Sequence, residues 1–366
     1  MIPRMAQHGR LKKPRKRRIA GGVDTHGDTH HAAVVLLNGA RVADAEFPAT
    51  ARGYAQLLSW LRSFGRLWAV GVEGTGCYGA GLARHLTEQG LRVVEVDRPD
   101  RRQRRTKGKS DPLDAYAAAD AVLSGRAQAI PKLGTGIVEA IRALHTTRAG
   151  AVKARTAAMN ELRSLLVTAP AEVRDRLRGL APVALVQACA RLRPAGDSAD
   201  PRVAVRAALR ALARRHQALT DEIADLDTQL RRLVERACPE LIAIKGVGYE
   251  TAAQLLVTAG DNPDRIGSEA AFAALCGVAP IPASSGKTRR HRLSHGGDRQ
   301  ANRALHMVAC TRLATCSKTR AYRDRRAREQ LSPKDILRCL KRYLAREVYK
   351  ALIRQNGDDP ERPAAA

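Results

Sequence analysis

Residues 19 to 125 follow an order of strands and helices that few folds share. Short apolar runs bounded by turn signals predict strands, and apolar residues spaced three and four apart predict helices. The expected strands are 19–24, 31–37, 40–47, 67–73 and 91–97, and the expected helices are 51–63, 78–88 and 111–125. Three strands therefore come first, with a tight turn at Asn38-Gly39. Strands and helices then alternate.

An antiparallel meander that continues into alternating strands and helices predicts a mixed α/β sheet of the ribonuclease-H-like (RuvC-like) kind. In that arrangement the first and fourth strands are neighbours, and the last helix packs across them. The segment 98–110 has no hydrophobic periodicity and is rich in arginine. We expect a basic loop in which Lys107 and Lys109 contact nucleic acid.

Four acidic side chains of this region are expected to meet at one edge of the sheet. Asp24 ends the first strand and Glu73 ends the fourth, while Asp111 and Asp114 begin the last helix on one face. Two Mg²⁺ ions about 3.5–4 Å apart would neutralise such a cluster and assist phosphodiester transfer. The alternative treats Asp111 as an ordinary helix N-cap before Pro112, with Asp114 favoured by the helix dipole.

Three histidines lie close to Asp24 in the sequence. His26 and His30 are four residues apart, as in helical zinc pairs, and His31 follows. Because this segment is expected to turn into a strand rather than to form a helix, the sequence does not favour a zinc site here.

A heptad pattern occupies the middle of the chain. Between Val205 and Leu233, apolar residues alternate steps of four and three, and His216 is the one polar member. This spacing is typical of a coiled coil, with His216 at a partly exposed position of the seam. The stripe could pair with a helix expected at 138–167 or with another subunit, and we favour a role in a homo-oligomer (a dimer or tetramer). Residues 168–201, which contain four prolines, are expected to form an irregular insert.

Residues 241–350 are predicted to form a mostly helical region. Near its start, Lys245 precedes a turn of Gly246, Val247 and Gly248 between two helices. Glycines in such a turn let backbone N–H groups approach a phosphate. A plain connection between helices is the alternative.

A serine-containing loop lies in the same region. Ser284 and Ser285 precede Gly286. The cations that follow are Lys287, Arg289, Arg290 and Arg292. Clustered cations can stabilise the charge on a phosphate that a serine hydroxyl attacks. The loop could also contact phosphate without catalysis.

The charge of the whole chain indicates a polyanionic partner. Its 366 residues include 64 lysines and arginines against 36 aspartates and glutamates, which leaves a net charge of +28. Seven scattered cysteines without C-x-x-C spacing argue against a disulfide framework and a cysteine zinc site. Without an apolar run of membrane-spanning length or a secretory signal, the sequence predicts a cytoplasmic, nucleoid-associated protein with no membrane contact.

Taken together, these segments resemble the IS110 family of insertion-sequence transposases. Four blocks carry the resemblance in order: GVDTH around Asp24, GVEGTGCY around Glu73, KSDPLDAYAAA from Lys109, and a C-terminal run. That run comprises IKGVGYETAAQLL, AAFAALCGVAPIPASSGK, RLSHGGDRQANRAL and SKTRAYRDR. The resemblance extends from about residue 19 to about residue 350. Four separated blocks in order are far more specific than a lone D-x-x-D.

The resemblance implies roles for particular residues. The residues that match the family's metal-binding acids are Asp24, Glu73, Asp111 and Asp114. Ser285, five residues after Pro280 and directly before Gly286, matches the nucleophile, with Ser284 as its near neighbour. In the family the serine attacks a DNA phosphate and forms a phosphoserine link. The acids and the serine of one composite site come from different subunits, and a non-coding bridge RNA pairs with donor and target DNA.

We therefore expect a DNA transposase or recombinase that uses Mg²⁺, a serine nucleophile and a bridge RNA. A Mg²⁺-dependent RuvC-like junction resolvase or nuclease, which needs no serine, is the alternative, and a non-catalytic nucleic-acid-binding protein is a third hypothesis. The expected fold class is α/β plus all-α. Its parts are a basic arm (1–18), a ribonuclease-H-like DEDD domain (19–128), a helical coiled-coil domain (129–239), a C-terminal transposase domain with the serine (240–352) and a tail (353–366).

Overall fold

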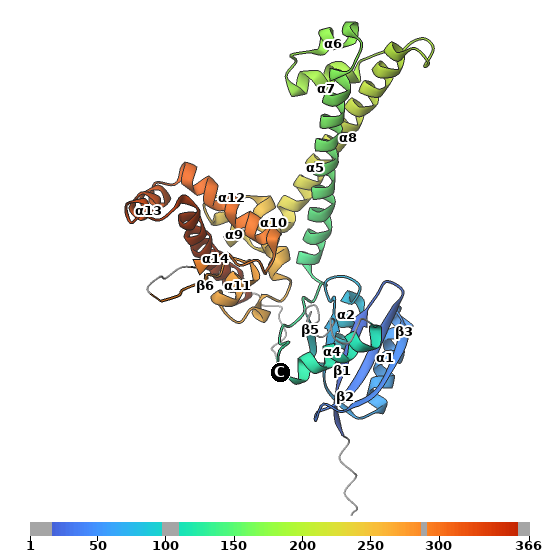
Figure 1. Ribbon diagram of the computed structural model, residues 1–366, viewed down its shortest axis with the longest axis vertical. Coiled ribbons are helices and arrows are strands. Elements are labelled where there is room, and N and C mark those ends of the chain that lie inside the picture. Colours follow the sequence, from blue (N-terminus) through green and yellow to red (C-terminus); the bar gives the residue numbers. More distant parts are fainter. Residues whose placement is uncertain (1–16, 97–109, 287–290, 358–366) are drawn as a thin grey trace, which may run out of the picture. The chain divides into compact units, whose positions relative to one another are not determined.

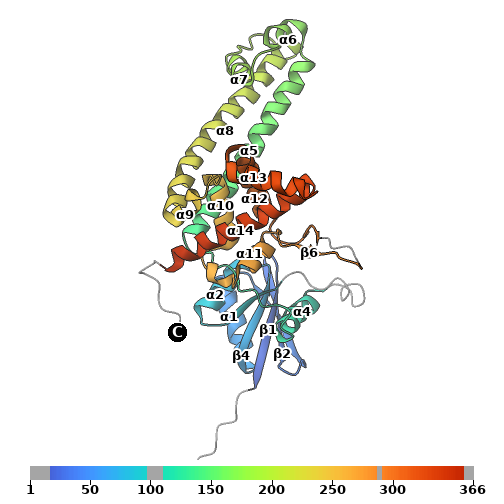
Figure 2. The same cartoon turned by 90° about the vertical axis from the view of Figure 1, so that its left-hand side faces the viewer.

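The computed structural model describes residues 17–96, 110–286 and 291–357. The chain divides into two compact units, of which the first ends at Gly134 and the second begins at Thr135. The first unit is built on a β-sheet and the second is mostly helical (Figures 1 and 2), as the sequence predicts. The expected nucleic-acid contacts that lie outside the described residues are Lys107, Lys109, Lys287, Arg289 and Arg290.

A mixed five-stranded sheet with the order β3-β2-β1-β4-β5 forms the first unit. Its strands are β1 (Arg18–Thr25), β2 (Thr29–Leu36), β3 (Arg41–Pro48), β4 (Arg66–Glu73) and β5 (Val93–Val96). The first three strands pair antiparallel, whereas β4 pairs parallel with both β1 and β5. All five expected strands are present, and the expected adjacency of the first and fourth strands is confirmed. This order is consistent with a ribonuclease-H-like arrangement.

Helices cover both faces of this sheet. They are α1 (Ala51–Ser63), α2 (Ala80–Glu88) and α4 (Asp111–Leu123). Successive residues of a strand point to opposite faces, and in β2 Ala32 and Val34 enter the core cluster that contains α1 and α2. Ala33 and Val35 pack instead with Ala115 and its neighbours on α4. The three helices thus match the predicted ones. Among the described helices of this unit, α1 and α2 pack on one face of the sheet and only α4 packs on the other.

Two long helices, α5 (Ile137–Val167) and α8 (Pro201–Ala237), lie side by side in the second unit (Figure 1). Arg148 pairs with Asp227 near one end and Arg215 approaches Glu161 nearer the other, so the helices run antiparallel. The heptad stripe of α8 is buried or half-buried along this pair. The structure therefore shows the stripe's partner within the same chain, and pairing with another subunit stays a prediction.

The segment 168–201 is not irregular, so that prediction is wrong. It contains two helices, α6 (Ala171–Leu177) and α7 (Pro182–Ala190), which pack against the ends of α5 and α8 in one apolar cluster. Pro170 stands at the N-cap of α6, and Pro182 and Pro201 are the first residues of α7 and α8. Proline is tolerated at a helix start because the first N–H groups have no partner inside the helix.

The rest of the second unit is a helical core. Its elements are α9 (Pro239–Ala243), α10 (Tyr249–Ala259), the 3-10 turn η1 (Pro263–Arg265), α11 (Glu269–Leu275), β6 (Ile281–Pro282), β7 (His291–Arg292), α12 (Arg299–Thr315), α13 (Ser317–Arg328) and α14 (Pro333–Gly357). One apolar cluster joins these helices to Ile141 of α5 and Leu230 of α8. Among the described residues, no helix is both long and apolar enough to cross a membrane.

Candidate active site

Strand pairing places Asp24 and Glu73 at the same end of the sheet. β1 and β4 run parallel with Val23 opposite Val72, so the next residue of each strand is its acid. Beyond the last paired residues, the Thr25 hydroxyl donates a hydrogen bond of 2.8 Å to the carbonyl oxygen of Glu73. The two strand ends are therefore held together where the acids stand.

Helix α4 brings the other two acids to the same place. The helix lies so close to the sheet that a Cβ at Gly22 would stand 2.1 Å from the carbonyl oxygen of Ala115. Asp111 and Asp114 occupy the first turn of this helix, and Asp114 is buried whereas Asp111 is exposed. Ser110, not Asp111, is the N-cap residue, which removes the simplest structural explanation for the Asp111 carboxylate.

A histidine joins two of the acids. His26 Nε2 lies 3.2 Å from an Asp24 carboxylate oxygen and 3.4 Å from an Asp111 carboxylate oxygen. Ligand atoms of Asp24, His26 and Asp111 all lie within 4.8 Å of one another. The helical spacing of His26 and His30 in the sequence does not indicate this contact. The useful signal is the D-x-H spacing at a strand end, because residues two apart on an extended chain share a face.

The electrostatics of Asp24 are those of a carboxylate in need of a cation. Burial raises its pKa above the ordinary value. His26 lowers the pKa again, while the negative charges of Asp114 and Asp111 raise it further. Asp114 thus stands near enough for its charge to act on Asp24.

These side chains fit a divalent cation. Carboxylate oxygens are the ligands that Mg²⁺ prefers, and an imidazole nitrogen is accepted by Mn²⁺ and other transition metals. Asp24, His26 and Asp111 could ligate one ion, with Asp114 adding charge beside them. Glu73 ends β4 at the same edge of the sheet as Asp24.

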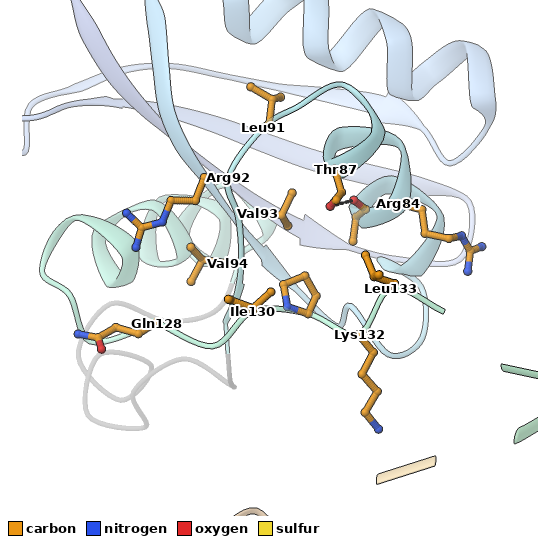
Figure 3. A pocket seen from close by; sticks show the side chains of 12 residues that line it. Arg84, Thr87, Leu91, Arg92, Val93, Val94, Gln128, Ile130, Lys132 and Leu133 are labelled. Atoms are coloured by element: carbon orange, nitrogen blue, oxygen red, sulfur yellow. Dashed lines mark hydrogen bonds between the residues drawn. The ribbon is translucent and has the colours of Figure 1, made fainter. Parts of the chain in front are cut away.

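A separate cavity of about 280 Å³ lies elsewhere in this unit, between α2, β5 and the segment 128–133 (Figure 3). Its lining is mostly aliphatic with two arginines and a lysine, and Arg84 donates a hydrogen bond to the carbonyl oxygen of Gly134. None of the four acids lines this cavity. It is therefore distinct from the acidic site.

The serine loop is a hairpin in the second unit. β6 and β7 form its base, with Ile281 opposite Arg292 and Pro282 opposite His291. Ser284, Ser285 and Arg292 are all exposed to solvent. A hydroxyl at the tip of an exposed hairpin is open to a large substrate.

The glycine turn at Gly246 connects α9 to α10, so the predicted helical hairpin is present. Gly246 adopts a φ of 87°, which favours glycine. Arg312 Nε donates a hydrogen bond of 2.7 Å to the carbonyl oxygen of Lys245, and its guanidinium also pairs with Glu347. The turn is thereby tied to α12 and α14, while Lys245 and Gly248 stay exposed.

Comparison with known proteins gives two family matches. Residues 21–169 match a transposase model for the DEDD domain of IS110 elements. Residues 238–324 match the model described as Transposase IS116/IS110/IS902 family. The first matched segment contains all four acids. The second contains Lys245, Gly246, Gly248, Ser285 and Arg292.

Two curated proteins are similar to the chain. The 43.6 kDa protein of insertion element IS110 from Streptomyces coelicolor is 34% identical over 133 residues, which are 35% of this chain and 32% of that protein. A probable family 20 transposase from Pseudomonas aeruginosa is 31% identical over 221 residues, or 59% of this chain and 63% of that protein. The matches thus span less than two thirds of either relative.

Proposed function

The chain belongs to the IS110 family of transposases, and we propose that it cuts and rejoins DNA to move an insertion sequence. The observation that carries this proposal is the convergence of Asp24, His26 and Asp111 within 4.8 Å, beside the buried Asp114. Phosphodiester transfer needs such a concentration of oxygen ligands where a phosphate can reach it.

In this proposal a ribonuclease-H-like, RuvC-like domain supplies the metal-binding acids. Asp24, Glu73, Asp111 and Asp114 would hold two Mg²⁺ ions, while His26 contacts both the Asp24 and the Asp111 carboxylates. Cations held by these residues would supply Lewis-acid stabilisation of the negative charge on a phosphate. The rigid packing of α4 on β1 fixes the distance between the acids.

Ser285 is the proposed nucleophile. Its Oγ forms a bond to a DNA phosphorus as the bond from that phosphorus to one deoxyribose oxygen breaks. The serine proton is lost, and the departing oxygen becomes a hydroxyl by taking up a proton. The phosphoserine link keeps a phosphodiester in place of the broken one, so a DNA hydroxyl can rejoin the strand without an external energy source. Lys287, Arg289, Arg290 and Arg292 follow in the chain to balance the phosphate charge.

Guidance by a non-coding bridge RNA is part of the same proposal. Base pairing would then read donor and target DNA, while the protein holds the paired strands by shape and backbone. The proposed backbone contacts include Lys107, Lys109, Lys245, Gly246 and Gly248. A homo-oligomer would let the acids of one subunit act with the serine of another.

The test uses the full chain with Mg²⁺, a plasmid that carries the gene and its flanking DNA, and RNA transcribed from those flanks. A covalent protein–DNA adduct should survive denaturation. Ser285→Ala should abolish the adduct, whereas Ser284→Ala, a change of the neighbouring exposed serine, should leave it. Asp24→Asn should abolish both cutting and the adduct.

Three outcomes contradict parts of the proposal. Cut ends without any adduct in the wild-type protein would indicate the nuclease alternative, in which water replaces the serine. An adduct of normal yield in Ser285→Ala that is lost in Ser284→Ala would move the nucleophile by one residue. An adduct that forms equally well when the RNA is omitted would remove the guide RNA from the mechanism.

A further inference from the structure

A cavity of about 1210 Å³ lies in the second unit at the base of the serine hairpin. The segment from Gly277 to Pro280 and the strand β7 form one side, and the end of α13 with the first four turns of α14 forms the other. Its volume exceeds the roughly 300–1,000 Å³ of most small-molecule sites. The cavity is therefore large enough to hold a segment of a polymer.

Cationic side chains dominate its lining. They are Arg292, Arg326, Arg338, Lys341, Arg342 and Arg346. Among the described residues, the carboxylates paired with this group are Asp335, Glu329 and Glu269, the last of which pairs with both Arg342 and Arg346. Six cations thus face three carboxylates, and the cavity keeps a positive excess.

Several cationic side chains that line this cavity carry donors with unfilled hydrogen-bonding capacity. Arg326 Nε and Arg342 Nη1 are buried, with no hydrogen-bond partner in the described part of the chain. Lys341 is 8% exposed, and burial lowers the pKa of its ammonium group. An ammonium has three donors, of which one binds Asn302 Oδ1 at 2.8 Å, and among the described residues no carboxylate forms an ion pair with Lys341. Buried cationic donors left in this way are costly unless an anion satisfies them.

The position of Lys341 is linked to the serine hairpin. Asn302, which accepts the Lys341 hydrogen bond, donates through Nδ2 to the carbonyl oxygens of Cys276 and Gly277. Gly277 begins the segment that lines the cavity and leads into β6. An anion held at Lys341 would therefore sit on the same support that carries Ser285.

We propose that this cavity binds the sugar–phosphate backbone of the DNA strand that Ser285 attacks, with Lys341, Arg342 and Arg326 as its phosphate ligands. Arginine forks match phosphate oxygens in pairs, and a lysine adds a point charge. The inference rests on the proposed function, because the choice of DNA depends on the neighbouring serine. The binding site itself does not depend on catalysis.

The test measures the binding of a fluorescent DNA duplex by the full chain across a series of salt concentrations. Lys341→Met should weaken binding about tenfold and should reduce the slope of log K against log salt by about one. Lys350→Met is the matched control, because it removes an exposed lysine from the same helix outside the cavity. It should change both quantities less than Lys341→Met does.

Arg338→Met provides a second variant that does not disturb a buried group, since Arg338 is 42% exposed where it lines the cavity. It should also lower the salt slope more than Lys350→Met. Wild-type affinity and slope in folded Lys341→Met, or losses no larger than those of Lys350→Met in both variants, would overturn the proposal. If Lys341→Met does not fold, Arg338→Met alone decides in the same way.

Further arms separate this inference from the proposed function. Ser285→Ala should bind DNA with the wild-type salt slope, because the serine supplies no charge. If no adduct ever forms but Lys341→Met still loses DNA affinity, the cavity stands and the serine mechanism fails. If Lys341→Met weakens binding of an RNA of the same sequence but leaves DNA binding unchanged, the cavity does not hold the DNA strand.

Discussion

Gly22 is the residue at which the packing of the sheet and the acidic site can be tested by one substitution. It lies on β1 two residues before Asp24 and faces α4. A Cβ added at Gly22 would stand 2.1 Å from the carbonyl oxygen of Ala115 and 2.3 Å from the backbone nitrogen of Ala119. Gly22→Ala should therefore push α4 away from the strand.

The size of this effect follows from the distances. A Cβ stays at least about 3.0 Å from such atoms, so α4 must move by about 1 Å. Overpacking usually costs roughly 1–3 kcal/mol, and the upper end applies because backbone atoms cannot rotate out of the way. Because Asp111 and Asp114 move with α4, a shift of this size should cost about 100-fold in activity.

Gly21→Ala is the matched control. Gly21 is the neighbouring buried strand residue and faces α1, where an added Cβ would stand 3.3 Å from a methyl group of Leu61. That side chain can adjust, and alanine is favoured over glycine within a strand by roughly 0.5–1 kcal/mol. Gly21→Ala should therefore leave the free energy of unfolding nearly unchanged.

Urea denaturation of both variants measures the free energy of unfolding, and calorimetric titration with Mn²⁺ measures binding of metal at the acids. Gly22→Ala should lose about 3 kcal/mol and most of its Mn²⁺ affinity, whereas Gly21→Ala should keep both. If the two variants have equal stability and equal Mn²⁺ affinity, the close approach of α4 does not set the geometry of the site.

Leu209 is fully buried where α5, α7 and α8 meet, so Leu209→Ala should lower the free energy of unfolding by roughly 2–5 kcal/mol in urea denaturation. A double-mutant cycle on Arg148 and Asp227, which join α5 to α8, should give a coupling of about 1 kcal/mol or less, because Asp227 is half exposed and water screens the pair. Burial lowers the pKa of His30 and of His145 below the ordinary 6.5. The unfolded chain then binds protons that the folded chain does not, so the free energy of unfolding should fall as the pH decreases below about 6.5. A variant with glutamine at both positions should show a flatter pH dependence.

The first unit could be predicted closely because its signals are local. Apolar runs, the Asn38-Gly39 turn and helical spacing each lie within one element, so strands and helices were placed from neighbouring residues alone. The prediction of an irregular insert at 168–201 was wrong for a physical reason. A proline such as Pro170 or Pro182 can either begin a helix or interrupt one. Here the apolar cluster around Leu209 stabilises the two short helices, and that cluster is formed by residues distant in sequence.

The partner of the heptad stripe shows a different limit. A stripe specifies that a helix has an apolar face, but it does not specify which helix covers that face. Here α5 of the same chain does so, as the Arg148–Asp227 pair shows. The heptad spacing favours a role in a homo-oligomer, but a local pattern cannot decide between a partner helix in the same chain and one in another subunit.

The part of the acidic site that lies at strand ends and at a helix start could be predicted from the sequence. Asp24 and Glu73 follow from strand pairing, whereas the contact of His26 with Asp111 depends on α4 lying over the end of β1. The packing of α4 over the end of β1 is a feature of the tertiary structure. Residues far apart in sequence must pack before the imidazole meets the second carboxylate, so no local pattern reports it.

The alanines of α4 belong to the same site for this reason. Gly22 lies under Ala115 and Ala119, and a Cβ at Gly71 of β4 would stand 2.7 Å from the carbonyl oxygen of Ala118. Small residues on the helix therefore face glycines on the two strands that carry Asp24 and Glu73. In the sequence such alanines indicate only helix propensity. In the fold these small residues let α4 approach closely enough for its first turn to reach the buried carboxylate of Asp24. A larger side chain at any of these positions would therefore alter the geometry of the acids.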